Sequence, residues 1–425
     1  MACRPTRLLV ATRHNPFPEN DGAGAYLFDL ISYLAGHGFE IEVAWLHAEG
    51  ALTHRGHWRS PDHFARVARL QIISGRSLGR LIIFPQALWL PFKAKRQHDI
   101  KSTLRFLGLG FLFRPSQTRP STQTSSCDGT LTAQRWSALP TPEETAFFKK
   151  RLRAFRPDAV LLNYCWLAPL LAGLDNLPSA ILTNDVVSQR LERTPGLAPD
   201  PATPEGEASL LTCARHILAI SEDDAANFRT RLPAHSVINA PKAAEPHIIS
   251  NPAVPNRVLF VGGLNDFNRE GILWFLSEVW PLIRARNPQA VLHICGGIGS
   301  TLSNVPVGVV LRGRVPDLAI EYTEASAVIV PLLHGTGVKI KLVEAASYGK
   351  AIITTPVGLQ GLGFLRTAVV EAAQATHFAD GVLPVLSDLA LQQKLSQTVL
   401  QQVAAHLSPD SAYGPVRQAL SVSSR

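Results

Sequence analysis

The 425-residue sequence is short of charged residues and of cysteine, since 17% of its residues are charged and it has five cysteines. The cysteines lie far apart, with no C-x-x-C pair and no Cys/His cluster at the spacing of metal ligands. A small disulfide-stapled scaffold and a cysteine-based metal site are therefore excluded. We expect buried or free thiols in a reducing compartment.

Long apolar runs are also missing. The most apolar stretches, residues 81–92 and 104–113, fall short of the roughly 20 residues that a membrane-spanning helix needs. The N-terminus, MACRPTRLLVATRHN, has a short apolar run without a small-residue cleavage site, which indicates a first buried strand rather than a signal peptide. We expect no membrane span and a cytoplasmic location.

Apolar residues make up 46% of the chain, which indicates a soluble globular protein rather than a disordered one. At roughly 150 residues per domain, the length predicts two to three domains. The 41 basic and 33 acidic residues give a net charge of +8. This balance favours phosphate-bearing or other anionic partners without choosing among nucleic acid, anionic lipid and nucleotide.

The first half of the chain alternates strand and helix patterns. An apolar strand at residues 7–12 precedes a turn-rich loop and a helix near residues 25–38, after which a second strand covers residues 39–48. This order is the unit of a parallel sheet. Apolar residues recur at helical spacing in the helix, at Leu27, Leu30, Ile31 and Leu34. Further strands are predicted at residues 157–166, 179–185, 216–221 and 236–240.

A second series of such patterns begins near Asn256. It has strand patterns at residues 256–263, 290–297, 308–314, 325–333 and 350–358, and a helix pattern at 271–288. The sequence therefore predicts an α/β fold of two Rossmann-like parallel-sheet domains that face each other across a cleft. The predicted parts are an N-terminal domain at 1–240 with a flexible insert at about 114–140, a second domain at 256–405, and a tail at 406–425 that could return to the first domain.

The most informative segment runs from Val330 to Leu362. A strand ends at Leu333, a small-residue loop covers residues 334–337, and a helix is expected from about Val338. Backbone N–H groups at a helix N-terminus, with little side-chain bulk in front of them, form an anion site that suits a diphosphate.

Two lysines and a carboxylate occupy this helix. Lys339 and Lys341 lie in the first turn, where a cation opposes the helix dipole and costs stability unless an anion is bound. Gly337, Lys341 and Glu344 share one helix face, so the carboxylate could accept hydrogen bonds from ribose hydroxyls. The alternative is an ordinary amphipathic helix with an i,i+3 ion pair.

At these residues the sequence resembles the nucleotide-sugar glycosyltransferases of the GT-B fold, specifically the large retaining family commonly numbered four. It is similar to a subgroup that reads G-T-G-V-K-x-K in the donor loop. The resemblance extends to NRVLFVGGLNDFN, HILAISEDDA, SVINAP and the opening NPFPENDGAGAY, with a poorer match at residues 55–138. It implies donor contacts at Gly22, Gly24, Gly262, Gly263, Gly335, Thr336, Gly337, Val338, Lys339, Lys341 and Glu344.

The chain departs from that family in two ways. Many members have a Glu eight residues before the ribose-binding one, where this chain has Thr336. Many also have an Arg and a Lys after the F-x-G strand, where this chain reads FVGGLNDFN. The resemblance therefore leaves Lys339 and Lys341 as the phosphate-binding charges. No D-x-D sequence occurs, so we expect no metal and no cofactor besides the donor substrate.

A second candidate site follows the strand near residue 181, in the segment ILTNDVVSQRLER. Similar enzymes read H-D-V-x-S-x-R at this strand end, and here Asn184 replaces the histidine. Asp185 could orient the acceptor hydroxyl or take its proton. The alternative is a helix-cap or turn aspartate. His14, which follows the first strand, is either a substrate contact or a loop histidine without a role.

Residues 93–119 hold seven basic side chains and one acidic one, interleaved with aromatic residues. This mixture suits the headgroup region of an anionic membrane. Nucleic acid is the competing partner, but no recognised binding module is present, and we expect none. The other alternative is a solvated basic face over ordinary core helices.

These observations predict a transferase that moves a sugar from a nucleoside diphosphate sugar to a sugar or glycolipid hydroxyl. The setting we expect is polysaccharide or glycolipid assembly at the inner membrane face. Asp185 and Lys341 are the candidate catalytic residues. The alternative is a catalytically silent relative that acts as a binding or scaffold subunit, and a nicotinamide oxidoreductase comes third because its glycine fingerprint is missing.

Overall fold

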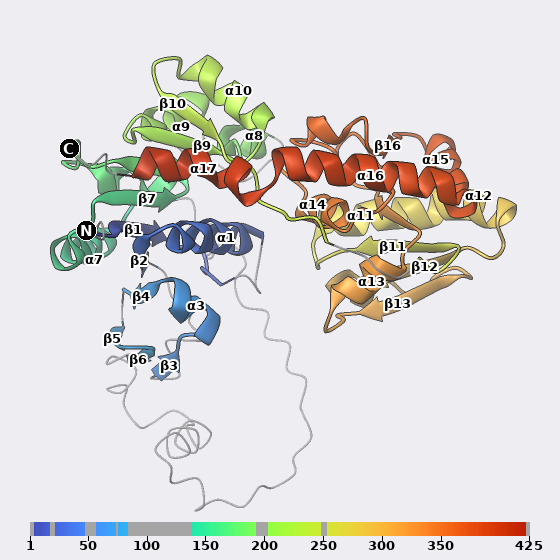
Figure 1. Ribbon diagram of the computed structural model, residues 1–425, viewed down its shortest axis with the longest axis horizontal. Coiled ribbons are helices and arrows are strands. Elements are labelled where there is room, and N and C mark those ends of the chain that lie inside the picture. The colour runs from blue at the N-terminus through green and yellow to red at the C-terminus, as the bar shows by residue number, and fades with distance from the viewer. Residues whose placement is uncertain are drawn as a thin grey trace, which may run out of the picture. The chain divides into compact units, whose positions relative to one another are not determined.

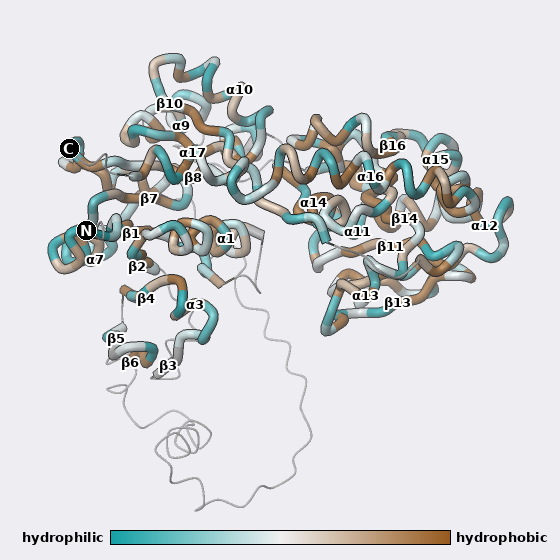
Figure 2. The backbone as a smooth tube through the Cα atoms, in the orientation of Figure 1, coloured by the Kyte–Doolittle hydropathy of each residue, from teal (hydrophilic) through white to brown (hydrophobic). Residues whose placement is uncertain are grey.

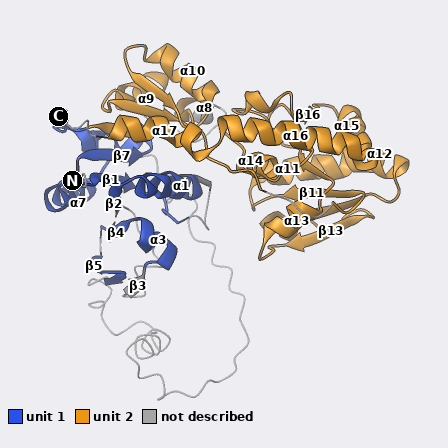
Figure 3. Ribbon diagram, viewed as in Figure 1, with its two compact units in different colours: residues 1–177 blue, residues 178–425 orange. Residues whose placement is uncertain are grey.

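The computed structural model describes residues 4–17, 22–46, 57–73, 75–83, 138–192, 203–247, 253–335 and 337–421. It contains two parallel sheets with associated helices (Figure 1). The chain divides into two compact units, residues 1–177 and 178–425 (Figure 3). The domain boundaries near residues 240 and 256 stay a prediction. The basic segment 93–119 lies outside the described residues, so its role stays a prediction too.

The first sheet has seven strands in the order β10-β9-β8-β7-β1-β2-β4. The strands span Thr6–Thr12 (β1), Phe39–Trp45 (β2), Arg69–Ile72 (β4), Ala159–Asn163 (β7), Ser179–Leu182 (β8), His216–Ala219 (β9) and Ser236–Asn239 (β10). The helices among them are α1 (Gly22–Gly36), α3 (Asp62–Val67), α7 (Pro142–Phe155), η2 (Cys165–Leu171), α8 (Val187–Glu192), α9 (Pro204–Leu211) and α10 (Glu222–Arg231). All the predicted strands of this half are confirmed.

The helical pattern predicted near residues 25–38 is also confirmed. Its four apolar positions are fully buried beneath α1, at Leu27, Leu30, Ile31 and Leu34. The helix begins three residues earlier than expected and ends at Gly36, and Gly38 follows with a φ of 87°. The sequence analysis predicted neither α7 nor the small antiparallel sheet β3-β6-β5, made of His57–Arg59 (β3), Arg76–Leu78 (β5) and Leu81–Ile83 (β6).

The second sheet has six strands in the order β13-β12-β11-β14-β15-β16. The strands span Arg257–Val261 (β11), Val291–Cys295 (β12), Val309–Gly313 (β13), Ala327–Val330 (β14), Ile352–Thr354 (β15) and Val370–Glu371 (β16). The helices are α11 (Asp266–Trp274), η3 (Phe275–Val279), α12 (Trp280–Arg286), η4 (Gly297–Thr301), α13 (Leu318–Glu324), α14 (Ile340–Ser347), η5 (Gly363–Leu365), α15 (Ala375–Ser387), α16 (Leu389–His406) and α17 (Pro409–Leu420). All five predicted strands are present.

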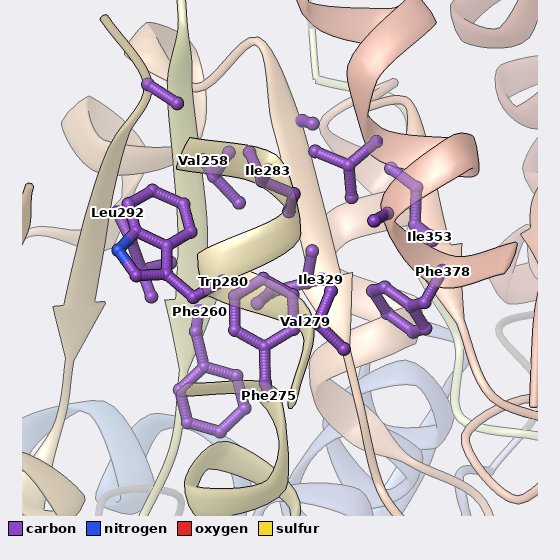
Figure 4. Close-up of a cluster of buried hydrophobic side chains, with 14 of the residues drawn as sticks. Val258, Phe260, Phe275, Val279, Trp280, Ile283, Leu292, Ile329, Ile353 and Phe378 are labelled. Atoms are coloured by element: carbon purple, nitrogen blue, oxygen red, sulfur yellow. The ribbon is translucent and has the colours of Figure 1, made fainter. Parts of the chain in front are cut away.

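Both faces of this second sheet are buried. Along β11, Val258 and Phe260 pack with η3, α12 and α15 in one cluster (Figure 4), whereas Leu259 between them packs with α13, α14 and α16 in another. This alternation follows from the two-residue period of a strand, and it explains why β14 is apolar throughout and β11 is apolar from Val258 onward. In contrast to these strands, helix α10, which lies between β9 and β10 of the first sheet, is mostly hydrophilic (Figure 2).

The predicted helix at residues 271–288 begins earlier, at Asp266. The side chain of Asn265 caps it by accepting a hydrogen bond from Asn268 N, and a π-helical turn, η3, interrupts it. A Cβ built at Gly271 would lie 2.4 Å from the carbonyl oxygen of Pro331, so α11 packs directly against the backbone that follows β14. Within the described residues, no helix is long and apolar enough to cross a bilayer.

Candidate functional site

The loop between β14 and α14 forms the centre of the candidate site. The strand ends at Val330 and the helix begins at Ile340, so the loop is longer on both sides than the sequence predicted. Gly335 and Gly337 have φ angles of 128° and 70°, which lie in the region that favours glycine. Thr336 between them lies outside the described residues. The backbone conformation therefore explains why small residues occupy this loop.

Two ammonium groups lie at the N-terminal end of α14. Lys339 is 9% exposed, occupies the N-cap position, and donates a hydrogen bond from Nζ to Gly337 O at 2.5 Å. Lys341 donates from Nζ to Asn268 Oδ1 and lies 5.1 Å from the centroid of the Phe260 ring. Burial, with the neighbouring Lys339, lowers the pKa of Lys341 to about 7. A bound anion would favour its charged form.

Asn268 is a site residue that the sequence analysis missed. It is 5% exposed and donates from Nδ2 to Gly263 O at 2.9 Å, while its Oδ1 accepts from Lys341. The amide thereby links the loop after β11 to the first turn of α14. Asn268 lies in the segment FVGGLNDFN, where the Arg and Lys of many family members are absent. That absence was a signal that another polar residue could take their place.

The two glycines after β11 have different surroundings. A Cβ at Gly262 would lie 2.8 Å from a Phe260 ring carbon, and a Cβ at Gly296 would lie 2.2 Å from Gly262 O. These close approaches hold the loops after β11 and β12 together. Among the residues that the structure describes, none lies within 4 Å of the Cβ position at Gly263, so a ligand could reach its backbone.

Glu344 lies on α14, one turn after Lys341. The hydroxyl of Tyr322, on α13, donates to Glu344 Oε2 at 3.2 Å. Burial raises the pKa of Glu344, while the Tyr322 hydrogen bond and the positive charges of Lys242 and Lys341 oppose that rise. Tyr322 and Lys242 were not predicted, because they come from segments far away in the sequence.

Asp185 lies beside the loop between β14 and α14 in the structure. It follows β8, is 9% exposed, and succeeds Asn184, whose φ is 59°. A Cβ built at Gly337 would lie 3.8 Å from Asn184 O and 3.9 Å from Asp185 Cβ. The structure therefore brings together these two candidate segments, which are about 150 residues apart in the sequence.

A buried carboxylate on α9 supports the Asp185 turn. Glu207 is 1% exposed and accepts hydrogen bonds from Val187 N at 2.8 Å and Ser188 Oγ at 2.7 Å. Arg231 donates from Nη1 to Glu207 Oε2, the oxygen that also accepts from Ser188, at 3.0 Å. Glu207 thus holds the first turn of α8 immediately after Asp185, and it is a second residue that the sequence analysis missed.

Four candidates remain, three in residues 1–177 and Val338 beside α14. Gly22 and Gly24 form the first turn of α1, and their donor contacts stay predictions. His14 stacks on Tyr164 with ring centroids 4.7 Å apart, where the parallel strands β1 and β7 end. Val338 packs against the cluster beneath α14, and a Cβ at Gly361 would lie 3.0 Å from its Cγ2, so this side chain has a packing role.

Comparison with known proteins finds a family similarity in the segment that forms the second sheet. Residues 255–388 match the family model of glycosyl transferases group 1. An uncharacterised 44.6 kDa protein in the cps region of Klebsiella pneumoniae is 30% identical over 118 residues, which are 25% of this chain and 30% of that protein. The chain therefore spans less than a third of the length of that curated relative.

Two solved structures resemble the whole chain. Sucrose-phosphate synthase of Thermosynechococcus elongatus has a TM-score of 0.64 at 16% identity, over 97% of this chain and 98% of that one. A TarM variant of S. aureus, in complex with Fondaparinux, alpha-GlcNAc-glycerol and UDP, has a TM-score of 0.63 at 9% identity, over 98% and 100%. At these identities the likeness shows the fold.

The two parallel-sheet α/β domains are those of the GT-B glycosyltransferases. The similarity to the glycosyl transferases group 1 covers residues 255 to 388, which is less than half of the chain. The predicted fold class is therefore confirmed, as is the family resemblance at this level. The retaining outcome and the G-T-G-V-K-x-K subgroup stay predictions.

Proposed function

We propose that this protein transfers a sugar from a nucleoside diphosphate sugar to a hydroxyl group of a sugar or glycolipid acceptor. The observation that carries the proposal is the arrangement on α14, where Lys339 and Lys341 lie at the N-terminal end and Glu344 follows one turn later. Two cations and a helix N-terminus suit a diphosphate, and a carboxylate at that distance suits a ribose.

Lys341 is the residue that meets the charge of the leaving group. When the bond between sugar and diphosphate breaks, negative charge grows on the diphosphate oxygens, and a positioned ammonium stabilises it most in the transition state. Its pKa of about 7 in the unliganded protein means that a diphosphate also draws a proton onto it. We expect activity to survive a metal chelator, because lysine and helix dipole meet this charge.

Asp185 serves the acceptor side in this proposal. It lies against Gly337, next to the loop that would hold the diphosphate and the transferred sugar. A carboxylate there can orient the acceptor hydroxyl and take its proton, provided that it stands within hydrogen-bond reach.

The cellular setting is polysaccharide or glycolipid assembly at the cytoplasmic membrane face. The relative in a Klebsiella pneumoniae cps region and the UDP of the S. aureus structure support this setting and a nucleotide-sugar donor. The basic composition of residues 93–119 supports an anionic membrane surface as a partner.

Calorimetry with UDP, GDP, ADP, CDP and TDP tests the donor site. Wild type should bind at least one of them, and Lys341→Met and Glu344→Gln should each weaken that binding by about 10-fold or more. Lys350→Met is the matched control, because Lys350 is also buried but its Nζ donates to the carbonyl oxygens of Thr323 and Ala325. If wild type and the three variants bind the nucleotide equally, α14 does not form the nucleotide site.

A transfer assay follows with sugar derivatives of the nucleotide that binds. Nucleotide release that depends on a glycolipid extract would support the transferase. Tight nucleotide binding without any release, across the common sugar derivatives, would favour the silent scaffold.

A further inference from the structure

Tyr322 is a buried tyrosine whose hydroxyl is directed at the carboxylate of Glu344. Its exposed fraction is 1%, and the hydrogen bond from its hydroxyl to Glu344 Oε2 is 3.2 Å long. Burial and the nearby carboxylate raise the pKa of Tyr322 well above its usual range, so the hydroxyl remains a donor at neutral pH. A donor fixed in the core therefore holds one of the two oxygens of Glu344.

The Tyr322 ring is the first of three stacked rings, followed by Tyr348 and His247. Tyr348 lies 4.8 Å from Tyr322 between ring centroids, and His247 lies 4.0 Å from Tyr348, with an interplanar angle of 11° in both pairs. The backbone N–H of His247 donates to Ser347 O at 2.8 Å, which ties the outer ring to the end of α14. Parallel rings packed in this way leave Tyr322 little freedom to turn its hydroxyl away.

We propose that Tyr322 is a positioning residue for ribose recognition, which holds Glu344 so that its carboxylate meets the ribose hydroxyls of a nucleoside diphosphate. Tyr322 acts through Glu344 and does not itself touch the nucleotide. The inference rests on the proposed function, since it requires a nucleotide at α14. It adds that the preference for a ribose over a sugar without these hydroxyls depends on α13.

The charges around Glu344 give the proposal a pH signature. The carboxylate faces Tyr322 from α13, Lys242 from the segment after β10, and Lys341 from its own helix, while Cys295 lies near Tyr322. Burial raises the pKa of Glu344, and the Tyr322 hydrogen bond lowers it. Removal of the hydroxyl should therefore let the carboxylate take up its proton at a higher pH, and ribonucleotide binding should weaken from that pH downward.

The test compares Tyr322→Phe with Tyr413→Phe. Tyr413 is also 1% exposed, and its hydroxyl accepts a hydrogen bond from Ala243 N at 3.0 Å, so this control loses a buried tyrosine hydroxyl elsewhere. Calorimetry at pH 6 and pH 8 measures the affinity for the tightest of UDP, GDP, ADP and CDP, and for its 2′,3′-dideoxy analogue. Thermal unfolding of both variants checks that they fold.

We expect wild type to prefer the ribonucleotide by about 10-fold or more. Tyr322→Phe should reduce this preference by about 3 to 10-fold, with a larger loss at pH 6, and leave the dideoxy analogue bound as in wild type. Tyr413→Phe should behave as wild type. An unchanged preference in Tyr322→Phe, or an equal loss for both ligands, overturns the proposal.

The failure of the proposed function gives a different result. If wild type binds none of the nucleotides, the donor site is wrong and the inference falls with it. If wild type binds the ribonucleotide and its dideoxy analogue equally, nucleotide binding stands, but Glu344 does not recognise the ribose and Tyr322 has no such role to support.

Discussion

Lys341 should destabilise the unliganded protein, and its replacement by methionine should raise the stability while it weakens nucleotide binding. Burial lowers its pKa from 10.5 to about 7. The unfolded chain keeps the proton up to about pH 10, so between pH 7 and pH 10 it binds more protons at this site than the folded chain does. By linkage, the stability of wild type relative to Lys341→Met rises with pH across this window.

The size of the effect follows from the two pKa values. At about 1.4 kcal/mol for each pKa unit, the burial of Lys341 costs about 4 kcal/mol at pH 7 and about 1 to 2 kcal/mol near pH 9.5. Lys341→Met keeps a side chain of similar length over the Phe260 ring and avoids this cost. It also leaves Asn268 Oδ1 without its donor, and this loss lowers the stability by about 1 to 2 kcal/mol. The net gain at pH 7 should be about 2 kcal/mol.

Urea unfolding of wild type and Lys341→Met at pH 7, 8 and 9.5 measures this difference. The exposed Lys394 on α16 supplies the control, since Lys394→Met should change the stability by less than about 0.5 kcal/mol at every pH. A gain that is the same at pH 7 and pH 9.5 would refute the reasoning, because the cost would then not come from the proton. Saturating nucleotide should narrow this difference by about 1.4 kcal/mol or more, since wild type should bind it about 10-fold or more tightly than Lys341→Met does.

Four further predictions concern other parts of the chain. Asp185→Asn should lower turnover by about 100-fold or more with nucleotide affinity nearly unchanged, and weakened nucleotide binding in calorimetry would give Asp185 another role. Glu207→Gln should also lower turnover and leave the nucleotide affinity alone, because it loosens the turn after Asp185, and wild-type kinetics would show that this turn needs no support. Gly271→Ala should destabilise the protein by about 2 kcal/mol or more, since its Cβ would meet Pro331 O, whereas Gly263→Ala should unfold at the wild-type urea concentration. Changing Lys93, Lys95, Arg96 and Lys101 to Gln should release the protein from anionic vesicles, and equal co-sedimentation with wild type would exclude a membrane role for these residues.

The sequence by itself determined those features that depend on local periodicity. Leu27, Leu30 and Ile31 recur at helical spacing, and their burial beneath α1 follows from that spacing alone. The alternating strand and helix patterns from Asn256 onward predicted a parallel sheet, and the structure has one at these strands. Lys341 and Glu344 share a helix face because they are three residues apart, so no knowledge of the rest of the fold was needed to pair them.

Only the tertiary structure decided which distant groups complete the site. Asn268, Tyr322 and Lys242 come from three separate segments, and each contacts or faces a residue of α14. The sheet order places β11, which precedes Asn268, beside β14, which precedes α14. Asp185 meets Gly337 although the two follow strands of different sheets, β8 and β14. A sequence pattern reports the face on which a residue lies, but the partner across that face depends on chain topology. The burial that shifts the pKa of Lys341 and of Glu344 is a property of that packing, and the spacing of residues along the chain does not contain it.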